Sequence, residues 1–144
     1  MCEINIGANI KRERKNKAIS QEELGKIVGL TQQSISSFEK GLSIPEISIL
    51  FLIAHALKCN AEVLLDIEPK ENVSFSGELL AKNIHYYRKK SNTTQANEAK
   101  RLNIATKTLS SYENGTSEPN ALFILRYVEL HHIEFKDLFV PHKG

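Results

Sequence analysis

Apolar and polar positions alternate with a helical period in a series of short segments, most clearly between residues 20 and 41. Leu24 and Val28, four residues apart, share one helical face, and Ile35 and Phe38, three residues apart, share another. Ser20 and Thr31 stand directly before the two patterns, where N-caps are favoured. Gly29 separates them, and glycine adopts the left-handed backbone that ends a helix without steric cost. The pattern predicts two short helices joined by a tight turn, the second running from Gln32 to Lys40 and ended by Gly41.

The pattern returns 74 residues later, so that the chain contains an internal repeat. Identical residues in this register are Asn9-Ile10 and Asn83-Ile84, Arg14 and Arg88, Gln21 and Gln95, Ser36-Ser37 and Ser110-Ser111, Glu39 and Glu113, Gly41 and Gly115, Ser43 and Ser117, Pro45 and Pro119, and Leu64 and Leu138. Apolar positions follow the same offset, as in Ile6 with Leu80 and Phe38 with Tyr112. We therefore expect two tandem domains of one all-α unit, at 1–68 and 76–144, joined by a linker at 69–75.

Each copy is predicted to contain five helices. The first copy has one over residues 5–17, the two just described, one after Pro45, and one from the N-cap Asn60 to about Asp66. The second has helices near 77–90, 95–102, 106–113, 120–131 and 134–140. Pro45 and Pro119 are expected just inside helix starts, where a missing amide hydrogen does no harm. The linker is too short for free tumbling of the copies, so we expect a fixed or narrowly hinged geometry.

The composition limits the class of protein but indicates no particular chemistry. The 144 residues are 41% hydrophobic and 25% charged, as in ordinary soluble domains. The longest apolar run, Ile49 to Ala54, is too short for a membrane span, and no early run resembles a signal peptide. Two cysteines, Cys2 and Cys59, are too few for a disulfide framework. A cytoplasmic protein is expected.

The polar face of the Gln32–Lys40 helix is the strongest candidate for a functional site. It carries Gln32, Gln33, Ser34, Ser37 and Lys40, the first three in its first turn. Amides at the leading end of a helix can reach base edges in a major groove, where glutamine pairs bidentately with adenine. These residues therefore point to binding of double-stranded DNA.

The segment T-Q-Q-S-I at Thr31–Ile35, within the two-helix pattern, resembles the helix-turn-helix of the lambda-repressor and Cro (XRE-type) family. The resemblance covers residues 6–66 strongly and 80–140 less closely, and implies two five-helix lambda-repressor-like domains. In this family the second helix of the motif lies in the major groove and the first crosses the backbone. The resemblance implies a bacterial or phage transcription regulator, repressor-like, that acts by occupying an operator.

Residue roles follow from that resemblance, position by position. Base-reading positions would be Gln32, Gln33, Ser34 and Ser37 in the first copy and Thr106, Lys107, Thr108 and Ser111 in the second. Phosphate contacts would come from Ser20, Gln21, Thr31, Lys40, Thr94 and Gln95, since helix N-termini favour anions. Two structural ion pairs, partly buried, would be Arg14 with Glu39 and Arg88 with Glu113.

The second copy departs from the first at several positions. Glu98 replaces the apolar Leu24, which we expect to weaken the core of its helix-turn-helix by one contact. Asn103 stands where Gly29 does, a tolerable exchange because asparagine enters the left-handed region readily. Residues 1–68 have a net charge of −1 and residues 80–144 of +4. The first copy, which has the better candidate for a base-reading helix, therefore lacks the large basic surface that is usual in DNA-binding proteins. The two copies must differ in specificity.

The helix after Pro45 is apolar nearly all round. Beyond its core positions it carries Ile49, Phe51 and Leu52, and its counterpart carries Phe123 and Leu125. An apolar helix in so small a domain implies a second buried surface. Docking of copy on copy and association of two chains both remain open. Either a tandem monomer or a homodimer could then present two reading helices to DNA.

Catalysis and metal binding find little support. There is no phosphate-binding glycine loop or nucleophile motif, and neither His55 with Cys59 nor His131 with His132 reaches a four-ligand zinc pattern. We expect no enzyme, no cofactor and no metal. The alternative function is a protein-interaction module, such as an antitoxin or a partner-binding regulator, in which one or both copies no longer touch DNA. The net charge of the first copy and Glu98 favour that alternative, whereas Gln32 and Gln33 argue against it.

Overall fold

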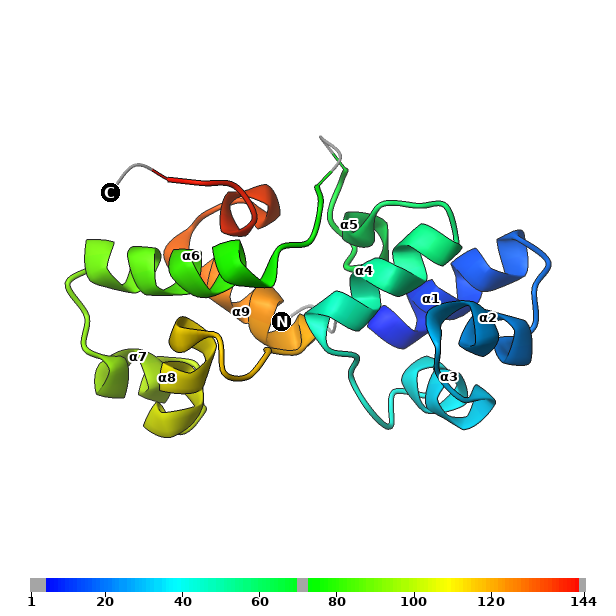
Figure 1. Cartoon of the computed structure of the whole chain (residues 1–144), viewed down its shortest axis with the longest axis horizontal. Coiled ribbons are helices and arrows are strands. Elements are labelled where there is room, and N and C mark those ends of the chain that lie inside the picture. The colour runs from blue at the N-terminus through cyan, green and yellow to red at the C-terminus, as the bar shows by residue number, and fades with distance from the viewer. Residues whose placement is uncertain (1–4, 70–72, 143–144) are drawn as a thin grey trace. The chain divides into compact units, whose positions relative to one another are not determined.

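A computed structural model describes residues 5–69 and 73–142 and divides the chain into two compact units, Met1–Val73 and Ser74–Gly144 (Figure 1). The first contains α1 (Ile6–Asn16), α2 (Gln21–Val28), α3 (Gln32–Glu39), α4 (Ile47–Ala56) and α5 (Ala61–Leu64). The second contains α6 (Gly77–Lys90), α7 (Gln95–Arg101), α8 (Thr106–Asn114), α9 (Ala121–His131) and a 3₁₀ turn, η1 (Phe135–Leu138). The expected all-α class, with two copies of one helical unit, is confirmed for the described residues. Of the expected linker 69–75, residues 70–72 lie outside the described residues, as does Cys2.

The helix-turn-helix of unit 1 has the ends that its sequence indicates. The Ser20 side chain accepts a hydrogen bond from the Glu23 amide and Glu23 returns one to Ser20, a capping box that begins α2. Gly29 ends α2 with φ of 76°, and Thr31 then caps α3. In unit 2, Asn103 takes the left-handed conformation of Gly29 with φ of 57°. The tight turn between the two helices is therefore kept in both units.

Each unit has its own apolar core. In unit 1, α3 packs on α1 and α2, while α4 packs on α2 and α5. The fully buried side chains of this core include Ile10, Leu24, Ile35, Leu50, Ile53, Leu57 and Leu64. In unit 2, α8 packs on α6 and α7, and η1 on α6 and α9, around Ile84, Leu109, Ile124, Tyr127 and Leu138.

A buried asparagine fastens the first helix of each unit to its last turn. The Asn9 side-chain amide donates to the Leu64 carbonyl at 3.0 Å, and Asn83 donates to the Val140 carbonyl at 2.9 Å. Both asparagines are at most 4% exposed. Each hydrogen bond gives a buried asparagine side chain the partner that a buried polar group needs. This accounts for the identity of the two positions in the repeat.

Two expectations about helix ends are corrected. Pro45 and Pro119 do not lie inside helices, because α4 and α9 begin at Ile47 and Ala121, after the N-caps Glu46 and Asn120. The last expected helix, 134–140, is the single 3₁₀ turn η1. Its two buried side chains, Phe135 and Leu138, are three residues apart, a spacing that 3₁₀ geometry places on one face. None of the described helices is long and apolar enough to cross a membrane.

Candidate functional site

The first turn of α3 presents its amide side chains outward. Gln32 and Gln33 are exposed, whereas Ile35 on the opposite face is completely buried. The Thr31 hydroxyl accepts from the Ser34 amide at 3.1 Å and lies 3.1 Å from the Ser34 hydroxyl. Ser34 and Ser37 are half-buried, and Lys40 is exposed. The result is a rigid helix start with two long amides free to meet a planar hydrogen-bonding partner.

A buried ion pair holds the far end of α3. Arg14 of α1 donates from Nε and Nη2 to the two carboxylate oxygens of Glu39, at 2.7 and 3.0 Å, and from Nη1 to the Ile19 carbonyl at 2.9 Å. The two side chains are only 10% and 2% exposed. Such a bidentate arrangement fixes orientation as well as distance. The ion pair therefore fixes the distance and orientation of α3 relative to α1.

The pKa values of this pair move in the directions that favour both charges. Burial alone would raise the pKa of Glu39, but hydrogen bonds from Arg14 and Gln21, with the charges of Arg14 and Lys11, hold it below its ordinary value. The hydrogen bond to Glu39 raises the pKa of Arg14 against the opposing effect of burial. Both groups are ionised at neutral pH.

Gln21, expected to contact phosphate, is also part of this cluster. Its side-chain amide donates to Glu39 Oε1 at 3.1 Å, and Gln95 donates to Glu113 Oε1 at 3.3 Å. The glutamine at the start of the first motif helix thus braces the ion pair in both units. Of the other positions expected at phosphates, Ser20 and Thr94 are exposed N-caps of α2 and α7, and Thr31 caps α3.

Unit 2 repeats the arrangement with different side chains. Arg88 pairs with Glu113 at 2.6 and 2.9 Å, and His85 Nδ1 adds a contact to Glu113 at 2.8 Å. Burial would raise the pKa of Glu113, but the hydrogen bonds from Arg88, His85 and Gln95 lower it. The second ion pair therefore carries one more partner than the first.

The outer face of α8 is less well suited to reading bases. Thr106 and Lys107 are exposed, Thr108 is half-buried, and the Ser111 hydroxyl donates to the Lys107 carbonyl at 3.1 Å. The N-cap of α8 is Ala105, which has no side-chain acceptor to offer. Lys107 is thus the one long exposed side chain among the four positions expected to read bases in this unit.

Glu98, expected to weaken the core by one apolar contact, lies beside a histidine that the sequence reasoning missed. Glu98 of α7 is 1% exposed, and His131 Nε2 at the end of α9 lies 2.9 Å from its Oε1. The angles are not those of a hydrogen bond, and Oε2 has no hydrogen-bond partner among the described residues. The ring of Tyr127 lies 4.4 Å from that of His131, and burial followed by the charge of Glu98 raises the pKa of Tyr127.

The repeat register contains the signal that could have revealed this pair. The residues 74 positions earlier are Leu24 and Leu57, both completely buried. Two buried leucines of unit 1 thus correspond to a carboxylate and an imidazole in unit 2.

The residues expected at a second apolar surface have different environments. Leu52 is 48% exposed, while Ile49 and Phe51 are half-buried. The ring of Phe123 packs inside unit 2, against Tyr112 at 4.8 Å and Tyr127 at 5.5 Å. Its burial therefore needs no second surface. Leu125 is also buried, at 7% exposure.

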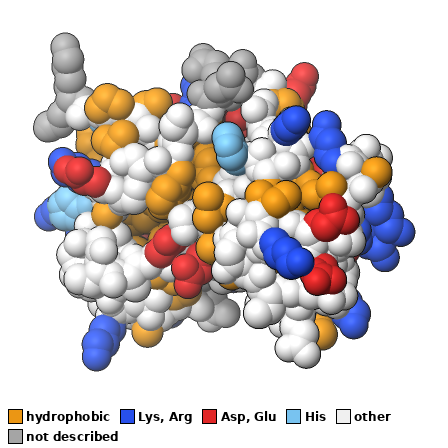
Figure 2. Space-filling view, turned by 45° about the vertical axis from the view of Figure 1, so that its right-hand side comes forward, with side chains coloured by type: hydrophobic (Ala, Val, Ile, Leu, Met, Phe, Trp, Pro, Cys, Tyr) orange, Lys and Arg blue, Asp and Glu red, His pale blue; other side chains and the backbone are white. Residues whose placement is uncertain are grey.

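Charge is dispersed rather than gathered. On the face shown in Figure 2, lysine and arginine side chains lie scattered among polar and apolar ones. Lys11, Lys15 and Lys17 of unit 1 and Lys89, Lys90 and Lys100 of unit 2 are exposed. Within the described residues no three histidine, cysteine, aspartate or glutamate side chains are grouped as a metal site would require.

Comparison with known proteins adds three findings. A family model described as helix-turn-helix, HTH_3, matches residues 10–64 and again residues 84–138. The chain is 38% identical over 52 residues to the uncharacterized HTH-type transcriptional regulator y4dJ of Sinorhizobium fredii (strain NBRC 101917 / NGR234), a match covering 36% of this chain and 68% of that one. The P22 c2 repressor, crystallised with synthetic operator 9T in the presence of Tl⁺, is 31% identical, with a TM-score of 0.43 over 46% of this chain and 100% of that chain.

Proposed function

The chain belongs to the helix-turn-helix family of DNA-binding transcriptional regulators in both of its units, and from this we propose that α3 and α8 each enter a major groove of an operator. The observation that carries the proposal is the outward position of Gln32 and Gln33 on a helix anchored at Ile35 and Glu39. Glutamine amides pair bidentately with adenine, and a fixed helix makes that pairing directional. Base reading is therefore assigned mainly to α3.

Unit 2 is proposed to contribute mainly phosphate contact. Its residues 80–144 carry a net charge of +4, and Lys107 projects from the first turn of α8. Phosphate contacts position a protein on the duplex without reading its sequence. Thr106, Thr108 and Ser111 are short side chains that would add hydroxyl contacts close to the groove floor. The proposed operator is therefore asymmetric, with one well-specified half and one tolerant half.

A homodimer is the second assembly that the surface of unit 1 favours. Ile27 of α2 is 61% exposed and Leu52 of α4 is 48% exposed, and the corresponding residues in unit 2 are Arg101 and Arg126. Exposed apolar side chains confined to one copy of a repeat are typical of a contact surface that the other copy lacks. Two chains joined through unit 1 would place two α3 helices on a palindrome, with half-sites about 34 Å apart.

We propose that the protein, of bacterial or phage type, regulates transcription in the bacterial cytoplasm by occupying its operator. A chain bound at an operator blocks or recruits polymerase according to where the operator lies. A protein partner that covers the apolar surface of unit 1 would change the assembly and hence the site that is read.

The test is selection of binding sites from a random duplex library by the full chain at two salt concentrations. We expect enrichment of a motif that includes adenine, and an affinity that falls steeply with salt as counterions are released. Gln32→Ala with Gln33→Ala should cost about 1–3 kcal/mol for each lost bidentate contact and relax the motif at those positions. His55→Ala, an exposed change on α4, is the matched control and should leave the motif intact.

Unit 2 is tested separately with Thr106→Ala and Lys107→Ala. These changes should weaken binding to all sequences and reduce the salt dependence, with the enriched motif unchanged. Unaltered affinity and motif in the Gln32 and Gln33 variant would contradict base reading by α3.

A further inference from the structure

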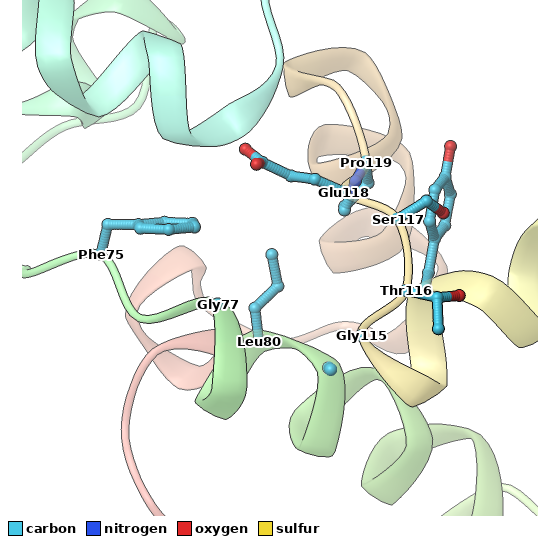
Figure 3. A pocket seen from close by; sticks show the side chains of 10 residues that line it. Phe75, Gly77, Leu80, Gly115, Thr116, Ser117, Glu118 and Pro119 are labelled. Carbon is cyan, nitrogen blue, oxygen red and sulfur yellow. The ribbon is translucent and has the colours of Figure 1, made fainter.

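Unit 2 has a pocket that gathers basic side chains. The pocket shown in Figure 3, at the end of α8, is of another kind, because no lysine, arginine or histidine of the described chain lines it. The basic one is formed by the C-terminal end of α7 and the second half of α9, and its volume of about 480 Å³ lies in the range of roughly 300–1,000 Å³ typical of small-molecule sites. This pocket, called the arginine pocket below, is lined by Arg101, Leu102, Arg126, Glu129, Leu130 and His132.

The two arginines of this pocket are set apart from the others by having no carboxylate partner. Arg12, Arg14 and Arg88 each form an ion pair with a glutamate, at 3.1, 2.7 and 2.6 Å. Within residues 5–69 and 73–142, neither the Arg101 nor the Arg126 guanidinium takes part in an ion pair or a side-chain hydrogen bond. The donors of both guanidiniums therefore remain available to a bound anion.

The repeat shows that the fold needs neither of these two charges. The residues 74 positions earlier are Ile27 and Leu52, both exposed and apolar. Arg101 is the last residue of α7, where the helix dipole favours a cation. Arg126 is in the middle of α9, where the dipole gives no such reason for a cation. Two like charges that line one pocket repel each other, so an anion between them would remove an unfavourable interaction.

The lining residues indicate the charge and the shape of the ligand. A guanidinium donates parallel hydrogen bonds to phosphate or carboxylate oxygens, and a pair of them matches a group with two charges. A phosphate monoester supplies close to two negative charges and three acceptor oxygens, whereas a carboxylate supplies a single charge and two oxygens. Leu102, which is 4% exposed, and the half-buried Leu130 provide an apolar wall for the rest of the molecule. Glu129 repels any further anionic group, so the ligand should carry only one phosphate.

We propose that the arginine pocket binds a small phosphate monoester, with its phosphoryl group between Arg101 and Arg126 and its apolar body against Leu102 and Leu130. The C-terminal ends of helices themselves disfavour an anion, so binding depends on both arginines. Because one arginine belongs to α7 and the other to α9, the bound ligand connects the helix-turn-helix of unit 2 to the helix behind it. A ligand that binds only the folded unit also stabilises it.

The experiment is an NMR titration of the full chain with phenyl phosphate in a buffer free of phosphate, at about pH 7.5, above the second phosphate pKa of about 6. We expect saturable shifts of the Nε–H signals of Arg101 and Arg126 and of the Leu102 amide. The Nε–H signal of Arg88, whose guanidinium is already paired, is the internal reference. Phenyl sulfate, a monoanion of the same shape, should bind at least about tenfold more weakly, because one charge is lost. Equal binding of phenyl sulfate, or no saturable shift, would overturn the proposal.

Single variants separate this site from general attraction of an anion to a basic protein. Arg101→Gln and Arg126→Gln each remove a guanidinium and should weaken phenyl phosphate binding at least about tenfold, with the amide spectrum of the rest of unit 2 native. Glu129→Gln removes the opposing carboxylate and should strengthen binding. Lys100→Gln is the matched control, since it removes one charge from an exposed side chain outside the pocket, and it should change binding by less than about twofold. Equal losses in Lys100→Gln and Arg101→Gln would refute a site built on the two arginines.

A saturating amount of the selected duplex distinguishes a ligand site from a contact to the DNA backbone. Phenyl phosphate that stays bound in the presence of the duplex supports a separate site. Displacement by the duplex would show that these arginines bind DNA phosphates, and would overturn the proposal. The titration and its variants do not depend on DNA binding. If the chain bound no duplex while the Arg101 and Arg126 signals still shifted, the proposed function would fail and the ligand site would stand.

Discussion

Replacement of His131 by leucine tests how the helix-turn-helix of unit 2 is held. His131 and Glu98 have side chains only 5% and 1% exposed, with Nε2 and Oε1 2.9 Å apart. Removing the imidazole would leave the Glu98 side chain buried between α7 and α9 without the ring that lies against it. Breaking a buried pair in this way costs about 3–5 kcal/mol. A unit of roughly 70 residues has little more stability than that in total, so His131→Leu should unfold unit 2 wholly or nearly so.

The double variant Glu98→Leu with His131→Leu restores the pair of leucines that unit 1 carries at Leu24 and Leu57. Apolar replacement of a buried polar pair is neutral or stabilising by about 1–4 kcal/mol, because no polar group then has to leave water. The double variant should therefore be at least as stable as the wild type. This outcome is opposite to the sum of the two single changes, which is the sign of a direct interaction.

The assay is urea unfolding of the full chain followed by NMR, so that each unit reports separately. Signals from Ala99 and Leu102 follow unit 2, while those from Ile35 and Leu50 follow unit 1 and should be unaffected. With a urea slope of about 1 kcal/mol/M for so small a unit, the single variant should lower the midpoint by about 3 M or abolish it. A single variant within about 0.5 kcal/mol of wild type, or a double variant as unstable as the single, would refute the reasoning.

Three further outcomes follow from the same contacts. Glu39→Ala should lower the stability of unit 1 by about 3 kcal/mol, since Arg14 is left buried without its carboxylate; a loss below about 1 kcal/mol in thermal melts would disprove that. The pKa of Glu39 is lowered in the fold, so its contribution to stability is present above the ordinary glutamate pKa of about 4.3 and is lost as pH falls below that pKa. Glu39→Gln should therefore flatten the acid limb of the curve of stability against pH, measured by calorimetry. An acid limb as steep as in wild type would contradict this. Ile27→Arg with Leu52→Arg, the residues of unit 2, should abolish self-association in sedimentation equilibrium with stability unchanged, and a persisting dimer would exclude this surface.

Local features were predictable because their physics lies within a few residues. The N-caps Ser20 and Thr31, the left-handed turn at Gly29 and the helical spacing of Leu24 with Val28 are all set by near neighbours. The repeat extended these predictions to the second unit without further information. The pairing of Arg14 with Glu39 came from the resemblance, since 25 residues separate them and no local rule connects them.

The remaining features depend on which side chains converge when helices pack. Gln21 turned out to brace Glu39, Phe123 to lie between two aromatic rings, and 134–140 to form one 3₁₀ turn. The sequence alone determined two copies of a helix-turn-helix, the first with amides on its outer face. Only the tertiary structure decided that Glu98 meets His131 and that Gln21 braces Glu39, because a buried side chain has its effect through atoms that are distant along the chain and close in space.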